Sequence, residues 1–256
     1  PELMDALVAS GIRHVRDSWN PRIEELARHG IRTQLVVEPV MPLGEIMAKL
    51  REILARTPGA IDSVEGPNEP DLFWVGKRGY QGSPTTPEGV LAGAAAFQRD
   101  LHAAIKTDPA TRHLIVIGPA LGRTYGYDTG SPFGKGTLAD HVDWGNFHPY
   151  PGGNPFSYPF PYGGVEKYLW HGDTPTTGMG EARHVFDIYA PPFAPKPMSA
   201  SETGYSTFDG GTPEQVHARY IPRLLAEYFR NGIKRTCLYE FADEFNNPPD
   251  REANFG

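Results

Sequence analysis

Apolar and polar positions along the chain follow two alternating periods. Residues 3–10 place apolar side chains at helical spacing and stop at Gly11, and the next stretch, IRHVR at 12–16, alternates apolar and polar residues like a strand. This order of helix and then strand recurs to the end of the chain. Further helices are predicted at 21–29, 43–56, 87–106, 178–189 and 212–230, and further strands at 31–37, 61–65, 114–118, 142–147, 197–201 and 233–240.

Seven strands that alternate with helices predict parallel pairing with right-handed crossovers. The simplest interpretation is one (β/α)8 TIM barrel domain over residues 1–256, whose first strand and last helix lie outside the visible sequence. A doubly wound open sheet is the alternative. That fold normally carries a glycine-rich first turn, which the sequence lacks.

Composition narrows the class of partner. The 256 residues include 31 acidic and 24 basic side chains, and the net charge of -7 gives no general attraction for nucleic acid or for an anionic membrane. Cys237 is the only cysteine, which excludes an internal disulfide framework. No apolar run approaches the roughly 18 residues of a spanning helix, and no signal peptide is visible at Pro1. The compartment is open, with a secreted or periplasmic location favoured, and so is the oligomeric state.

Two glutamates stand at predicted strand ends. Glu69 lies in VEGPNEPD and Glu202 lies in SASETGYS, 133 positions later. Active sites of barrels are built just past the carboxyl ends of strands, and hydrolysis of a glycosidic bond needs one carboxylic acid and one carboxylate. Pro67 and Pro70 flank the first motif, and we expect them to fix the orientation of Asn68 and Glu69 without a helix or strand. The other strand-end side chains are Arg16, Trp19, Glu38, Arg123, His148, Tyr150, Tyr205, Tyr239 and Glu240.

The two motifs together resemble clan A glycoside hydrolases, a large group of barrel enzymes that includes cellulase-like and β-xylosidase-like families. The resemblance implies that Glu69 is the acid/base and Glu202 the nucleophile. It also extends to IRHVRDSW, with Arg16 near the nucleophile, and to GNFHPYP, with His148 and Tyr150 lining the site. The clan usually places a tryptophan after its last strand, where this chain has CLYEFADE.

Substrate contacts are expected from polar and aromatic strand-end residues, because the apolar face of a sugar packs on an aromatic ring. The expected set is Arg16, Asn68, Trp74, His148, Tyr150, Tyr205 and Tyr239. Each has a structural alternative: Asn68 could cap a turn, Arg16 could form only a salt bridge, and His148 could be a core residue. No His-x-His, His-Glu-x-x-His or Gly-x-Gly-x-x-Gly pattern occurs, so we expect neither a metal nor a nucleotide cofactor.

The sequence therefore predicts a retaining glycoside hydrolase that cleaves β-linked oligo- or polysaccharides by double displacement. Two alternatives stay open. One is a non-catalytic barrel that binds carbohydrate, and the other is a transglycosylase that uses the same glutamate pair. The identity of the sugar, its linkage and the choice between internal and terminal cleavage depend on loops that the sequence does not specify.

Overall fold

The computed structural model of the chain describes residues 2–73, 80, 87–122, 131–150, 189–209, 211–244 and 249–256. These residues divide into two compact units. Unit 1 contains residues 1–122, 132–146 and 192–196, and unit 2 contains residues 123–131, 147–191 and 197–256. The expectation of one catalytic domain over the whole chain stays a prediction.

Unit 1 is built on four parallel strands in sequence order. They are β1 (His14–Asp17), β2 (Arg32–Val36), β3 (Ile61–Glu65) and β4 (Ile115–Ile117). A parallel bridge between Ile117 and Trp144 continues this order toward β5 (Gly145–Phe147). β2 and β3 are almost entirely buried, as parallel strands covered by helices usually are, whereas β1 is half-buried or exposed along its length.

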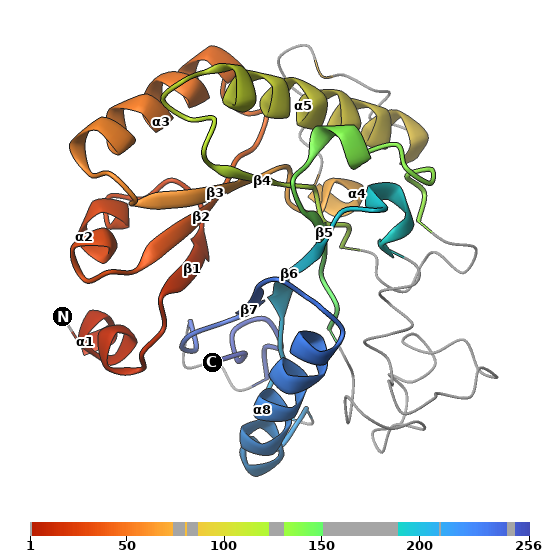
Figure 1. The fold of residues 1–256 in the computed structure, drawn as a ribbon. Helices are drawn as coiled ribbons and strands as arrows, with labels where there is room; N and C mark the ends of the chain where they lie inside the picture. The colour runs from red at the N-terminus through yellow and green to blue at the C-terminus, as the bar shows by residue number, and fades with distance from the viewer. Residues whose placement is uncertain are drawn as a thin grey trace. The chain divides into compact units, whose positions relative to one another are not determined.

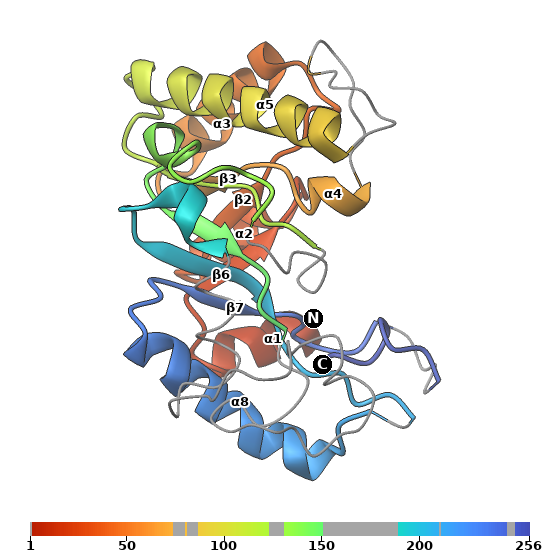
Figure 2. The same cartoon turned by 90° about the vertical axis from the view of Figure 1, so that its right-hand side faces the viewer.

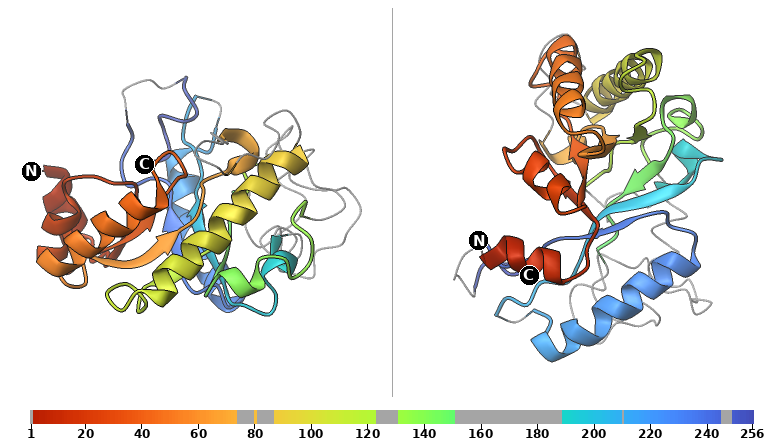
Figure 3. Two further views of the ribbon diagram at one scale, coloured as in Figure 1. Left: turned by 90° about the horizontal axis from the view of Figure 1, so that it is seen from above. Right: turned by 60° about the vertical axis from the view of Figure 1, so that its left-hand side comes forward.

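The helices of unit 1 pack on its sheet through apolar stripes. α3 (Leu43–Arg56) buries Ile46, Met47, Leu50 and Leu54, and Figures 1 and 3 show it beside α5 (Pro87–Thr107) across one face of the strands. α1 (Glu2–Ala9) and α2 (Ile23–Arg28) precede β1 and β2. The glycines predicted to end these helices, Gly11 and Gly30, have φ angles of 80° and 74°, a conformation that favours glycine.

Unit 2 contains β6 (Met198–Thr203) and β7 (Thr236–Leu238), which pair in parallel. α8 (Glu214–Arg230) runs alongside β6 and β7 in Figure 2. Its Tyr228 is fully buried and lies 6.4 Å from Phe147 between ring centroids. The predicted helix at 178–189 lies, apart from Tyr189, outside the described residues.

All seven predicted strands are present, and all of their described pairings are parallel. Several are shorter than predicted: β7 ends at Leu238 and not at residue 240. Three short elements were not predicted, namely α4 (Pro70–Phe73) and the 3-10 helices η1 (Ala139–His141) and η2 (Pro191–Phe193). No helix among the described residues combines the length and apolar character needed to cross a bilayer.

Candidate active site

In unit 1, the end of β3 leads into a short turn that sets the conformation of Glu69. The Glu69 N–H donates to the Ala120 carbonyl at 3.0 Å, and the Glu69 carbonyl accepts from the Leu72 N–H at 2.9 Å. Pro70 then opens α4, so the turn does use one turn of helix, contrary to our expectation. Glu69 has a φ of 43°, which is uncommon for a residue other than glycine; residues in such conformations cluster at functional sites.

The Glu69 carboxyl group occupies the space next to Gly122 that a side chain at that position would need. A Cβ atom at position 122 would lie 2.7 Å from Cδ and 2.8 Å from Oε2 of Glu69, closer than real Cβ contacts occur. Asp71 holds the Gly122 segment in place by accepting its N–H at 2.8 Å. The position of the Glu69 carboxyl group therefore depends on a glycine on the neighbouring segment.

Glu65, at the end of β3, is the centre of a buried polar network. Its side chain has no solvent exposure, and Arg16 on β1 donates to both of its oxygens at 2.9 Å. Gln34 on β2 donates at 2.7 Å, and Asn146 donates at 3.0 Å. A buried carboxylate is tolerated only with such compensation. The register that pairs Arg16 with Gln34 brings both donors to Glu65.

Asn68 is held by its side chain and by its backbone. Its Oδ1 accepts from Arg16 Nη2 at 2.5 Å, and its N–H donates to Glu38 Oε1 at 2.6 Å. Among the described residues, the Asn68 Nδ2 has no hydrogen-bond partner. Arg16 therefore forms a salt bridge to Glu65 and also orients the amide of Asn68 through its Oδ1.

Glu38, just past β2, is half-buried beside Glu65. Burial and, to a smaller extent, the negative charge of Glu65 raise the pKa of Glu38 to about 7, against the opposing effects of the Asn68 N–H and of Arg16. The Glu38 side chain therefore changes its charge near neutral pH.

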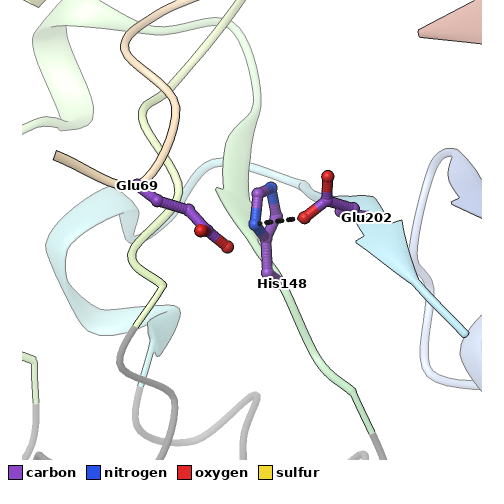
Figure 4. Close-up of side chains that lie close together, drawn as sticks. All are labelled: Glu69, His148 and Glu202. Carbon is purple, nitrogen blue, oxygen red and sulfur yellow. Dashed lines mark ion pairs between the residues drawn. The ribbon is translucent and has the colours of Figure 1, made fainter. Parts of the chain in front are cut away.

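In unit 2, Glu202 on β6 is paired with His148, which follows β5. Their Oε2 and Nδ1 atoms lie 3.1 Å apart, and the ion pair is drawn in Figure 4. The other ring nitrogen of His148 lies 3.0 Å from the Ser201 hydroxyl. The His148 side chain is fully buried, while Glu202 retains 15% exposure. A neutral imidazole in this position can donate to Glu202 and accept from Ser201.

The segment that carries His148 is fixed through the carbonyl of Pro149. This carbonyl accepts hydrogen bonds from the Thr203 hydroxyl at 2.5 Å and from the Tyr228 hydroxyl at 2.7 Å. Both donors are buried, one on β6 and one on α8. His148 is thus a core residue with satisfied nitrogens and, at the same time, the direct partner of Glu202.

The predicted aromatic residues of unit 2 pack against other rings. Tyr205 is buried against Tyr220, with ring centroids 5.3 Å apart. Tyr150 and Tyr239 each pack on Phe255, at 5.6 Å and 5.4 Å. Burial and the surrounding carboxylates, Glu240 foremost, raise the pKa of Tyr239 to about 12. Trp74 and Arg123 lie outside the described residues.

Residues that the sequence did not single out complete the site. Glu65 ends a buried strand, which is a signal that it needs a cationic partner, but nothing in the sequence identified Arg16 two strands away as that partner. Gln34, Asp71, Gly122 and Asn146 gave no signal of their own. Histidine and glutamate often bind metal ions. In unit 2, however, His148 Nδ1 and Glu202 Oε2 form an ion pair with each other.

The sequence matches no known family profile and no curated protein. Solved structures do resemble the chain over its whole length. Virulence factor SghA from Agrobacterium tumefaciens has a TM-score of 0.59 at 14% identity, with 79% of that protein covered. The family 17 β-1,3-glucanosyltransferase from Rhizomucor miehei has a TM-score of 0.60 at 17% identity, with 85% covered.

The family 1 β-glucosidase from Exiguobacterium antarcticum gives a similar result, a TM-score of 0.57 at 13% identity with 80% covered. At these identities the likeness establishes the fold. The parallel strand order and the full-length matches agree with the barrel predicted from the sequence. The chain therefore has the α/β barrel fold that clan A glycoside hydrolases share.

Proposed function

We propose that the chain is a retaining glycoside hydrolase for β-linked oligo- or polysaccharides, with Glu69 as acid/base and Glu202 as nucleophile. The observation that carries this proposal is the place of the two glutamates in a glycosidase-type barrel fold. Glu69 follows β3 and Glu202 lies near the end of β6, and the carboxyl ends of barrel strands form the catalytic face. The strained φ of Glu69 and the His148 partner of Glu202 support a fixed orientation for each.

The reaction takes place in two steps. Glu202 attacks the anomeric carbon, and Glu69 gives its proton to the departing glycosidic oxygen, which leaves as an alcohol. Glu69, now a carboxylate, removes a proton from water, and that water displaces Glu202 from the anomeric carbon. The sugar is released with its original configuration, and both glutamates return to their starting protonation states.

The surroundings of each glutamate suit these roles. His148 can donate to Glu202 and so stabilise its carboxylate before attack. In unit 1, the Asn68 NH2 group can donate to a sugar hydroxyl next to the bond that breaks. In this proposal three tyrosines either contact the substrate or pack behind residues that contact it, namely Tyr150, Tyr205 and Tyr239.

Activity of substituted proteins tests the proposal. We expect the wild-type protein to release nitrophenol from a β-glycoside within a panel of nitrophenyl sugars, and to cleave a β-glucan. Glu202→Ala should abolish turnover, with partial rescue by azide that gives an α-glycosyl azide. Glu69→Ala should lower kcat/KM about 10²–10⁴-fold on substrates whose leaving group needs protonation.

Glu214→Ala and Glu45→Ala are matched controls, because both glutamates are exposed in the first turns of helices and should not affect turnover. Full activity in Glu202→Ala would refute the assignment of the nucleophile. A crystal structure offers an independent check, since a retaining pair has its carboxyl groups about 5–5.5 Å apart.

A transglycosylase is the second candidate, because one of the similar structures, that from Rhizomucor miehei, is a β-1,3-glucanosyltransferase. An active-site mutant of that enzyme was also solved with laminaritriose. In that case an acceptor sugar replaces water in the second step. Product analysis at high acceptor concentration separates the two activities. Binding of oligosaccharides without any turnover would instead favour a non-catalytic barrel.

A further inference from the structure

Glu38 is a carboxylate at a strand end that the proposed reaction does not use. It lies just past β2, and its Oε1 accepts the backbone N–H of Asn68 at 2.6 Å. This N–H belongs to the peptide that joins Pro67 to Asn68, so Glu38 holds the turn one residue before Glu69. All of these residues lie in unit 1.

The contact with Glu38 is one of three hydrogen bonds that fix successive groups of the turn. Glu38 binds the Asn68 N–H, Arg16 binds the Asn68 Oδ1, and the Ala120 carbonyl binds the Glu69 N–H. Together they fix the backbone on the side where Glu69 takes its φ of 43°. A residue in this conformation needs such support, because the same chain can otherwise relax to a more favourable φ.

A carboxylate at position 38 is an unfavourable choice for a merely structural acceptor. Glu38 is half-buried and close to the buried Glu65, which carries the same charge. A water molecule or a neutral side chain could satisfy one backbone N–H without this repulsion. An ionised carboxylate, however, binds an N–H about twice as strongly as a neutral acceptor and so holds the turn more rigidly.

We propose that Glu38 is a positioning residue for Glu69: through the Asn68 peptide it holds the acid/base in the direction of the glycosidic oxygen. This inference rests on the proposed function. The groups that face Glu38 are Glu65 on β3, Arg16 on β1 and the Asn68 N–H, and they act on its charge in opposite directions. Because burial places the pKa of Glu38 at about 7, the hold on Asn68 weakens as the pH falls below neutrality.

The test compares two substrates with the same sugar. One is a β-linked alkyl glycoside, whose leaving group needs a proton, and the other is the 2,4-dinitrophenyl glycoside, whose leaving group does not. Glu38→Ala should lower kcat/KM on the first substrate about 10–100-fold, as expected for a misplaced acid. On the dinitrophenyl glycoside kcat/KM should stay within about threefold, because protonation by Glu69 is not needed there.

Glu38→Gln provides a variant of nearly the same shape that keeps an oxygen acceptor but carries no charge. We expect a smaller loss, again confined to the substrate that needs a proton. The loss should be larger near pH 8, where Glu38 is ionised in the wild type, than near pH 6. Glu45→Ala, an exposed glutamate in α3, is the control and should change neither substrate.

The outcomes separate this inference from the proposed function. If the wild-type protein hydrolyses no glycoside, the proposed function fails, and this inference fails with it. If the wild type is active and both Glu38 variants lose the same factor on both substrates, or lose nothing, Glu38 does not position Glu69 and the proposed function stands.

Discussion

Glu69 obtains its orientation from small features of its neighbours as much as from its own backbone. The missing side chain of Gly122 leaves the space that its carboxyl group occupies, and Asp71 fixes the Gly122 backbone next to it. In the proposed mechanism this carboxyl group must lie within hydrogen-bond reach of the glycosidic oxygen, so a small displacement has a large effect on the rate.

Gly122→Ala tests this dependence. The added methyl group would overlap the Glu69 carboxyl and the Leu72 side chain, and we expect kcat/KM to fall about 10²-fold as the acid moves by roughly 1 Å. The measurement is kcat/KM together with circular dichroism to confirm folding. Gly44→Ala in α3 is the matched control, since a Cβ atom there meets nothing within 4 Å. An unchanged rate in Gly122→Ala would show that Glu69 does not act from this position.

Among the elements of unit 1, β1, β2 and β3 are joined at their carboxyl ends by more than backbone hydrogen bonds. Arg16, Gln34 and Glu65 come from successive strands and meet around one buried carboxylate, with Asn146 as a fourth member. The network stabilises the sheet edge only while it is complete, because Glu65 without Arg16 would be an uncompensated buried charge.

Removing the cation should therefore destabilise the fold. We expect Arg16→Ala to lower the free energy of unfolding by about 3–5 kcal/mol, measured by urea denaturation. Replacing both partners, as in Arg16→Met with Glu65→Leu, should recover part of this loss. Arg56→Ala serves as the control, because its ion pair with Glu24 is exposed and should contribute far less. Equal effects of Arg16→Ala and Arg56→Ala would contradict the role given to the network.

The elements were largely predictable because alternation of apolar positions reports burial directly. The seven strands followed from this pattern, and α3 was predicted with its observed bounds. The exceptions have local causes: α4 is one turn initiated by Pro70, too short to show a helical period, and β7 ends where its ladder with β6 ends. Side-chain networks were less predictable, because the compensation of Glu65 joins residues 16, 34 and 146, which no local pattern connects.

The strand-end glutamates illustrate the limit of sequence patterns at the site. Glu69 and Glu202 were recognisable because each follows an apolar strand within a characteristic motif. His148 was expected either to line the site or to be a core residue; its contact with Glu202 was not predicted, and the segment that carries it is held by a hydrogen bond from α8 to the Pro149 carbonyl. Distances of this kind come from packing and are not encoded in the spacing of residues.

For the molecule as a whole, two carboxyl groups make folding depend on pH. Burial and nearby carboxylates raise the pKa of Glu240 to about 7, with Glu244, Asp243 and Glu252 adding to the effect of burial. The pKa of Glu38 is likewise about 7. Between their unfolded values of 4.5 and this range, the folded chain binds more protons than the unfolded chain. Stability should therefore fall as the pH rises through this window.

Urea denaturation near pH 5 and near pH 8 measures this effect, and the two groups should contribute greater stability to the wild type at the lower pH. Glu240→Gln, which cannot ionise, should reduce the difference between the two conditions. Glu214→Gln, at an exposed position, should leave the difference unchanged. A larger difference in Glu240→Gln than in the wild type would reverse the sign assigned to Glu240.

The twofold anchoring of the Pro149 carbonyl has a consequence for protein engineering. A designer who repacks the core beneath α8 would regard phenylalanine as a neutral replacement for Tyr228, since the ring fits the same space and the position lies outside the motifs of Glu69 and Glu202. That exchange would remove one of two donors that keep His148 beside Glu202. Libraries intended to raise thermal tolerance should leave Tyr228 fixed, because its hydroxyl group supports the segment that carries His148, the partner of Glu202.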